Sequence, residues 1–190
     1  MAKKALRIGF DLDGVILYNP VRIFRPIASF VKPLVFKPNC QRFYFPRTDP
    51  EKFLWKILHK TSFWEAPGLR DIGKLALEKR IEPFIITARY DFLKDDVEQW
   101  FRKIQSHARF SKCIYNTKNE EPHFFKERMI KDLDLDVFVE DNWGIVEYLS
   151  PKFRRTKIAW IYNLLDRTIP YPYKFPSLKK TIEHIIAHDL

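Results

Sequence analysis

The ten residues LRIGFDLDGV, at positions 6–15, place two aspartates and a glycine directly after an apolar run. A short apolar run that ends at a turn signal is typical of a buried strand. Side chains two positions apart share a face of a strand, so Asp11 and Asp13 should leave its carboxyl end on one side. Gly14 then allows the backbone to turn sharply without a side-chain clash.

Two carboxylates this close repel each other, and one of them would keep its proton unless a cation lay between them. A hard divalent cation with oxygen ligands relieves the repulsion, and beside phosphate that cation is usually magnesium. One carboxylate can then attack phosphorus while the other transfers protons. The alternative is an Asp-Gly turn after an edge strand with both acids solvated, and ten residues alone do not separate the two interpretations.

The composition limits the class of protein. A chain of 190 residues suits one domain with room for an inserted sub-domain, and its apolar and aromatic content excludes a disordered chain. Two cysteines, Cys40 and Cys113, make neither a disulfide framework nor a zinc site, which favours a reducing cytoplasm. The basic first residues precede only a short apolar run broken by charges, which makes a poor secretory signal. Because no run of about 18 uncharged apolar residues occurs, we expect no membrane-spanning helix.

The net charge is +10, from 34 basic and 24 acidic residues. Such a charge suits an anionic ligand, which could be a phosphorylated metabolite, a nucleotide or a nucleic-acid end. It also suits a basic protein without any such ligand, because a high net charge by itself only keeps a protein soluble. The charge therefore selects no partner.

Strands and helices alternate along most of the chain. We expect strands at residues 5–10, 83–87, 112–115, 136–140 and 156–161. We expect helices at 67–80 and 122–133, one that begins at Asp91, a short one that follows Asn142 and ends at Tyr148, and one that begins at Ser177. This alternation predicts an α/β fold with a doubly wound, Rossmann-like parallel sheet of five strands covered on both faces. Ligands of such sheets lie outside the carboxyl ends of the strands.

Residues 15–66 interrupt the alternation. Prolines recur up to residue 50, and a helix capped by Asp49 follows, with an apolar stripe of Phe53, Leu54, Ile57 and Leu58. We therefore divide the chain into an α/β core, residues 1–14 and 67–190, and a small inserted cap, residues 15–66, over the end of the first strand.

The cap is both basic and aromatic. Its basic residues are Arg22, Arg25, Lys32, Lys37, Arg42 and Arg47, interleaved with Phe24, Phe30, Phe36, Phe43, Tyr44 and Phe45. The aromatic side chains could stack on a nucleobase. We favour instead that they form the cap's own small core and its packing against the sheet, because an insertion needs apolar mass to hold its shape. Contact with an anionic membrane surface is a third reading, which we do not favour because the cap shows no basic amphipathic helix.

Three predicted strands end in residues of the kinds that a metal and phosphate site requires. The first strand ends in Asp11 and Asp13, the second in Thr87, and the fourth in Glu140 and Asp141. Because the ends of parallel strands meet at one edge of the sheet, we expect these side chains to converge. Their convergence around one cation is the central expectation from the sequence.

These motifs resemble those of the haloacid dehalogenase superfamily of phosphohydrolases. The segment DLDGV at 11–15 resembles its first motif, IITAR at 85–89 its second, and VFVED at 137–141 its fourth. The motif order and spacing match across nearly the whole chain, and the insertion lies where that superfamily carries a cap. Within the superfamily the short pattern looks most like 5′-nucleotidases and deoxyribonucleotidases.

The resemblance implies a role for each matching residue. Asp11 would be the nucleophile that forms an aspartyl-phosphate. Asp13 would protonate the leaving oxygen and then deprotonate the hydrolytic water, while its backbone carbonyl would contact the metal. Thr87 and the amide of Ala88 would bind the phosphoryl oxygens. Asp11, Asp13 and Asp141 would together hold Mg²⁺.

The third motif of the superfamily is a single lysine, and three candidates precede the fourth strand: Lys118, Lys126 and Lys131. Lys126 is the preferred candidate because it falls in the first turns of a helix near the carboxyl edge of the sheet. Lys118, on a loop, is second, and Lys131 should be carried toward the far edge. The acidic pair also departs from the usual double aspartate, since Glu140 replaces the first acid; we expect it to lie behind the metal ligands.

Two further sets of residues have open roles. Arg89 could hold a second phosphate or a substrate carboxylate, or it could pair with an acid such as Asp91, which we slightly favour. The five histidines, at positions 59, 107, 123, 184 and 188, show no ligand spacing, so we expect structural or surface roles for all of them.

The sequence thus predicts a magnesium-dependent phosphomonoesterase that acts on a nucleotide or another small phosphorylated metabolite. One alternative is a phosphatase of nucleic-acid ends, which the basic cap favours. Another is a non-catalytic module that keeps the fold and the anion site, to which the ambiguous lysine and Glu140 point. The sequence does not indicate an oligomeric state.

Overall fold

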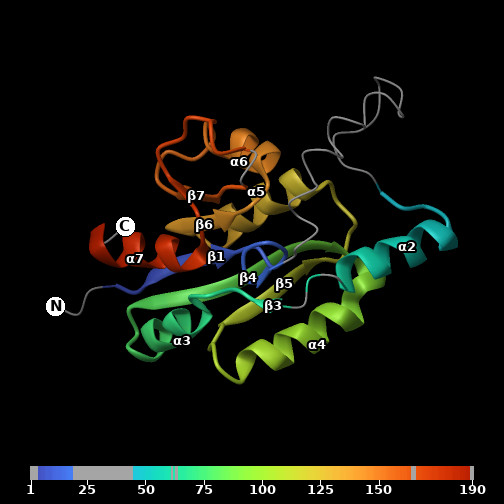
Figure 1. Ribbon diagram of the computed structural model, residues 1–190, viewed down its shortest axis with the longest axis horizontal. Coiled ribbons are helices and arrows are strands. Elements are labelled where there is room, and N and C mark those ends of the chain that lie inside the picture. Colours follow the sequence, from blue (N-terminus) through green and yellow to red (C-terminus); the bar gives the residue numbers. More distant parts are fainter. Residues whose placement is uncertain (1–3, 19–44, 61, 63, 164–165, 189–190) are drawn as a thin grey trace.

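The computed structural model describes residues 4–18, 45–60, 62, 64–163 and 166–188, without the side chains of Leu58 and His188 (Figure 1). A parallel sheet crosses its centre in the order β5-β4-β1-β6-β7-β8. The strands are β1 Leu6–Phe10, β4 Ile81–Tyr90, β5 Lys112–Asn116, β6 Val137–Glu140, β7 Lys157–Ile161 and β8 Lys174–Phe175. Since β1 pairs with β4 on one side and β6 on the other, the strand before the two aspartates is central.

The predicted parallel α/β fold is confirmed, with one difference in strand number. A sixth strand, β8, pairs with β7; it lies between the predicted strand at 156–161 and the helix predicted from Ser177 onward, where no strand was expected. It has only two residues, too few to show any alternation in the sequence.

Helices cover both faces of the sheet (Figure 1). On one face lie α3 Leu69–Leu77, α4 Lys94–Gln105 and α7 Leu178–His188, and on the other α5 Pro122–Asp132 and α6 Trp143–Leu149. Each helix turns an apolar stripe inward, such as Ile72 and Leu75 of α3. The two resulting apolar clusters sandwich the sheet and leave its carboxyl edge for polar residues.

The segment after β4 differs from the prediction. β4 continues to Tyr90, and a 3₁₀ turn at Asp91–Leu93 precedes α4. The helix expected from Asp91 onward, with Asp91 as its capping residue, thus begins only at Lys94: neither the turn nor α4 has a side-chain cap, and the amide of Asp91 donates to Asn119 Oδ1 at 3.0 Å. The pairing of β4 with β5 is irregular between Thr87 and Tyr90, so the strand bends next to the predicted phosphate-binding motif.

The described part of the insertion has two elements. A two-stranded antiparallel ribbon joins β2 Leu17–Tyr18 to β3 Trp64–Glu65, so the insertion begins and ends at neighbouring positions. Between them lies α2 Asp49–Lys60. Most of the predicted basic and aromatic cap residues, from Arg22 to Tyr44, lie outside the described residues, and the division at 15–66 stays a prediction.

Helix α2 begins with a capping box, and its capping residue is not the predicted Asp49. The amide of Glu51 donates to Thr48 Oγ1 at 3.4 Å, and Glu51 Oε2 accepts from the amide of Thr48 at 3.0 Å. Thr48, rather than Asp49, is thus the capping residue. The predicted apolar stripe is exposed at Phe53, Leu54 and Ile57. Among the described helices, none combines the length and the apolar character needed to cross a lipid bilayer.

Candidate active site

Three acids meet at the carboxyl ends of β1 and β6. The amide of Asp11 donates to the carbonyl of Val139 at 3.0 Å, which locks the two strand ends together. One carboxylate oxygen each from Asp11, Glu140 and Asp141 lies within 4.8 Å of the others, and all three residues are buried. We call these three residues the acidic cluster. The sequence-predicted convergence of residues 11 and 141 is thus present in the structure.

Gly14 makes this convergence sterically possible. Its φ of +84° lies in the left-handed region that residues with a side chain rarely adopt. A Cβ at this position would lie 2.3 Å from Asp141 Oδ2, well inside van der Waals contact. The turn after β1 therefore passes directly beneath the carboxylate of Asp141, and only glycine fits there.

Lys126 brings a positive charge to the acidic cluster. Its Nζ lies 2.5 Å from Glu140 Oε2 and 3.1 Å from Asp11 Oδ1, and the residue is 2% exposed. Burial acts to lower the pKa of this ammonium, but Asp11 and Glu140 raise that pKa above its usual value. Of the other predicted candidates, Lys131 pairs with Glu127 at the surface and Lys118 is exposed.

Glu140 uses both of its carboxylate oxygens to organise the loop after β6. Oε1 accepts from the amides of Asp141 at 3.1 Å and Asn142 at 2.9 Å, while Oε2 accepts from Lys126. Burial raises the pKa of Glu140; Lys126 opposes that shift and Asp141 adds to it. With its oxygens already engaged, Glu140 fits a supporting position behind Asp11 and Asp141.

The acidic cluster carries more negative charge than Lys126 neutralises. Burial raises the pKa of Asp11 well above its usual value; Lys126 acts against this shift, and Glu140 and Asp141 reinforce it. Buried carboxylate oxygens of this density are the donors that a hard divalent cation such as Mg²⁺ binds. The residues present therefore fit the predicted magnesium, with Asp11 and Asp141 best placed to hold it.

Asp13 lies apart from the acidic cluster and has a cation of its own. Arg89 donates through Nε to Asp13 Oδ2 at 2.8 Å and through Nη2 to Oδ1 at 2.7 Å. Burial acts to raise the pKa of Asp13, but the charge and hydrogen bonds of Arg89, aided by His59, hold that pKa well below its usual range. The metal contact predicted for Asp13 concerned its backbone carbonyl and stays a prediction.

Arg89 pairs with acids, as the slightly favoured interpretation expected, but Asp91 is not one of those shown. Arg89 binds Asp13 and, through Nη1, Asp96 of α4. His59 of α2 also reaches the site, with Nδ1 3.4 Å from Asp13 Oδ2. His59 was expected to have only a structural or surface role, whereas it contacts Asp13, and Asp96 was not singled out from the sequence. Neither residue belongs to a motif that marks it as part of this site.

Thr87 and Ala88 lie where the second motif predicts them, at the carboxyl end of β4 beside β1. Thr87 is 1% exposed, and its Oγ1 accepts from the amide of Arg89 at 3.3 Å. This placement leaves a hydroxyl and a main-chain segment at the same edge of the sheet as Asp11. Their predicted contact with phosphoryl oxygens stays a prediction.

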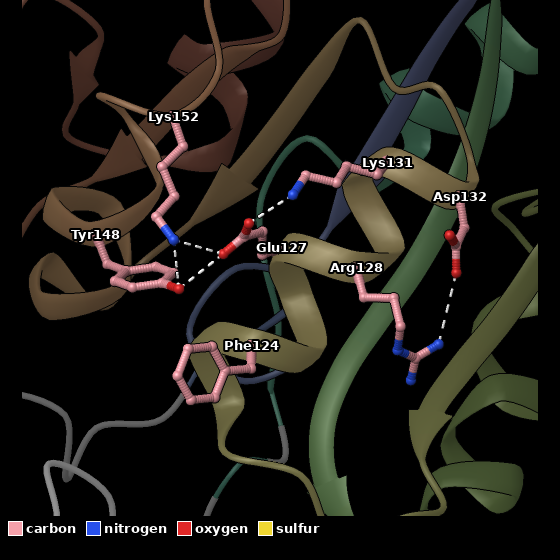
Figure 2. A pocket seen from close by; sticks show the side chains of 7 residues that line it. All are labelled: Phe124, Glu127, Arg128, Lys131, Asp132, Tyr148 and Lys152. Carbon is pink, nitrogen blue, oxygen red and sulfur yellow. Dashed lines mark hydrogen bonds and ion pairs between the residues drawn. The ribbon is translucent and has the colours of Figure 1, made fainter.

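A separate hollow of about 430 Å³ lies between α5 and α6 (Figure 2). At its centre, Glu127 accepts from Lys131, Lys152 and Tyr148, and these hydrogen bonds lower its pKa to about 2. No residue of the acidic cluster lines it. Each of its charged side chains is paired with another, so we assign the chemistry to the sheet edge rather than to this hollow.

Comparison with known proteins gives the fold a name. No protein-family model matches the chain, and no curated protein matches it in sequence. Solved structures match over nearly its full length. A haloacid dehalogenase-like family hydrolase from Xanthomonas campestris has a TM-score of 0.53 at 11% identity, over 98% of this chain and 96% of that one. The fold is the haloacid dehalogenase-like fold.

Two further structures with this fold support the assignment. CbbY from Rhodobacter sphaeroides, solved in complex with phosphate, has a TM-score of 0.56 at 13% identity and covers 93% of this chain and 96% of its own. A protein from Lactobacillus delbrueckii subsp. bulgaricus, assigned as a phosphoglycolate phosphatase, has a TM-score of 0.55 at 10% identity. The match covers 97% of this chain and 99% of that one. At these identities the likeness establishes the fold alone.

Proposed function

We propose that the protein is a magnesium-dependent phosphomonoesterase that works through an aspartyl-phosphate at Asp11. The observation that carries the proposal is the position of Asp11, beside Asp141 and 3.1 Å from the ammonium of Lys126. A carboxylate can attack an anionic phosphate only where fixed positive charge cancels their repulsion. Magnesium held by Asp11 and Asp141 would supply further positive charge at the transferring phosphoryl group.

In the first step an oxygen of Asp11 forms a bond to phosphorus as the ester P–O bond breaks. The bonding pair remains on the leaving oxygen, which takes a proton from Asp13. In the second step Asp13 accepts a proton from water as that water attacks phosphorus, which releases inorganic phosphate and restores Asp11. Arg89 and His59 hold the pKa of Asp13 well below its usual range, so the carboxylate is ionised and able to accept a proton in the second step; an arriving phosphate adds negative charge that raises this pKa for the first step.

The remaining residues would hold the phosphoryl group in place. Thr87 and the amide of Ala88 lie at the adjacent strand end and would donate to its oxygens. Lys126 would contact the same oxygens from the α5 side while favouring the ionised form of Asp11. Each correctly placed donor of this kind contributes a factor of about 10²–10³ to turnover.

We further propose a small phosphorylated metabolite as substrate, with nucleoside monophosphates as the first group to test. Small phosphorylated ligands occur in structures with this fold, since CbbY was solved with phosphate and with xylulose-(1,5)bisphosphate. The net charge of +10 favours an anionic ligand in general. It is also the observation that keeps a nucleic-acid end as the second candidate. A cytoplasmic location, which rests on the low cysteine content, stays part of the proposal.

The test is hydrolysis of p-nitrophenyl phosphate with magnesium and after its removal by EDTA. We expect turnover that requires magnesium and that Asp11→Asn abolishes, whereas Asp132→Asn, an exposed position on α5, leaves it unchanged. Turnover that persists after magnesium is removed by EDTA, or full activity in the Asp11→Asn variant, would contradict the proposal. An inactive wild-type protein that still binds phosphate would identify the non-catalytic module instead.

A substrate panel separates the two anionic classes. Nucleoside monophosphates and sugar phosphates are compared with 5′- and 3′-phosphorylated oligonucleotides at 50 and 200 mM salt. A small-molecule enzyme should show a KM that changes little with salt. A phosphatase of nucleic-acid ends would instead lose affinity steeply, because counterion release governs binding to the polymer.

A further inference from the structure

The two aspartates of the first motif are neutralised by different cations. Asp11 lies in the acidic cluster with Lys126, whereas both carboxylate oxygens of Asp13 accept from Arg89. The acidic cluster does not include Asp13, although only one residue separates it from Asp11 along the chain. The structure therefore sorts two neighbouring acids into two separate environments.

The geometry of the Asp13–Arg89 contact fixes the carboxylate in orientation as well as in charge. Two parallel N–H···O bonds, at 2.8 and 2.7 Å, hold the plane of the carboxylate to the plane of the guanidinium. The Arg89 side chain is 1% exposed, so little solvent competes with these bonds. A single-point contact, such as a lysine would make, would leave the carboxylate free to rotate.

Arg89 is itself held from two directions. The irregular pairing of β4 between Thr87 and Tyr90 sets its backbone, and its amide donates to Thr87 Oγ1 at 3.3 Å. At the far end of its side chain, Nη1 contacts Asp96 of α4. A strand end and a helix thus support one guanidinium, whose remaining donors face Asp13.

We propose that Arg89 is a positioning residue that aims the Asp13 carboxylate at the leaving oxygen of the substrate, with Asp96 as its anchor. This inference rests on the proposed function, because it assigns Arg89 a share in proton transfer to the leaving group. Arg89 does not contact the substrate's phosphoryl group in this scheme. Its loss should therefore affect only those reactions in which the leaving oxygen needs a proton.

The kinetic test compares two leaving groups. The value of kcat/KM is measured for p-nitrophenyl phosphate, whose leaving group departs without a proton, and for glycerol 2-phosphate, whose alkoxide requires one. We expect Arg89→Met to lower kcat/KM for glycerol 2-phosphate about 10–100-fold and for p-nitrophenyl phosphate less than about threefold. Asp13→Asn should show the same selectivity, and Arg89→Lys should recover part of the loss.

The controls separate positioning from other roles. Arg128→Met, on the surface of α5, should change neither value, and Asp96→Asn should show the Arg89→Met selectivity in weaker form. An equal fall with both substrates would overturn the proposal, because Arg89 would then bind the phosphoryl group or only support the fold. A rise in KM alone, with kcat unchanged for both substrates, would overturn it as well.

A crystal structure of the Arg89→Met variant, with thermal unfolding of the variant in parallel, tests the inference without any activity. We expect the Asp13 carboxylate to leave its wild-type orientation while Asp11, Asp141 and Lys126 remain in place. An unchanged Asp13 side chain would overturn the inference. If the wild-type protein shows no Asp11-dependent turnover, the proposed function fails, and this structural result still decides whether Arg89 positions Asp13. If Arg89→Met does not fold, the same comparisons are made with Arg89→Lys.

Discussion

Gly14 and Asp141 approach so closely that a Cβ on Gly14 would lie 2.3 Å from Asp141 Oδ2. The contact joins the turn after β1 to the turn after β6, which are more than a hundred residues apart in sequence. It also fixes the distance between the first and fourth motifs. The acidic cluster depends on this contact, because any side chain at Gly14 would push Asp141 away from Asp11.

Substitution of Gly14 by alanine tests this contact. The φ of +84° and the clash with Asp141 should together cost about 1–3 kcal/mol of unfolding free energy. Gly144 in α6 is the matched control, since its nearest neighbour would be 3.4 Å from an added Cβ and a helical alanine is favourable. In urea unfolding, Gly14→Ala should lower the midpoint relative to the wild type, whereas Gly144→Ala should not lower it. Equal midpoints for the two variants would contradict the steric argument.

Removal of the buried lysine should be far more costly than removal of an exposed one. Lys126→Met leaves Asp11 and Glu140 buried without their shared cation, which should cost about 3–5 kcal/mol of unfolding free energy. Lys131→Met breaks an exposed pair with Glu127 and should cost under about 1 kcal/mol. Chemical unfolding of both variants measures the difference. If Lys126→Met were as stable as Lys131→Met, Lys126 would not balance the acidic cluster.

Magnesium should stabilise the protein by relieving the crowded charge of the acidic cluster. At a concentration one hundred times its dissociation constant, a cation that binds only the folded state adds about 2.7 kcal/mol. Without magnesium, Asp11→Asn should unfold at a higher temperature than the wild type, because burial already disfavours the Asp11 carboxylate. Addition of magnesium should then change the unfolding temperature of the Asp11→Asn variant only slightly. A full magnesium-induced shift in Asp11→Asn would place the cation elsewhere.

The half-buried thiol of Cys113 gives a prediction about pH. Burial raises its pKa to about 12, although Arg89 acts to lower it. The folded protein thus keeps a proton that the unfolded chain loses above its ordinary pKa near 9. This proton binding favours the folded state below pH 9, and the resulting stability is lost as the pH rises from 9 toward 12.

Alkylation measures this directly. In a Cys40→Ser background, Cys113 of the native protein should react with iodoacetamide at pH 9 at least tenfold more slowly than it does in urea, as followed by mass spectrometry. Equal rates in the two conditions would show that the thiol is accessible and ionised.

The parallel sheet was predictable from sequence because each strand except β8 is an apolar run bounded by turn residues. The positions of Asp11, Thr87 and Asp141 at the carboxyl edge of the sheet were predictable for the same reason, as each lies at or just beyond the end of such a run. Lys126 was one of three candidates, and only the direction of α5 distinguishes it from Lys118 and Lys131. The contacts of Arg89 with Asp13 and Asp96 join β4 to a loop and a helix, and no local pattern encodes such pairings.

The measurement that tests the central proposal most directly is chemical trapping of the phosphorylated enzyme. The protein is mixed with substrate and magnesium, quenched with acid and treated with borohydride, which reduces an aspartyl-phosphate to homoserine. In the sample treated with substrate, peptide mass spectrometry should find homoserine at position 11 alone. A control sample of the Asp13→Asn variant that receives no substrate should contain none. Homoserine at another position, or phosphate release from an enzyme that never acquires it, would contradict Asp11 as the nucleophile.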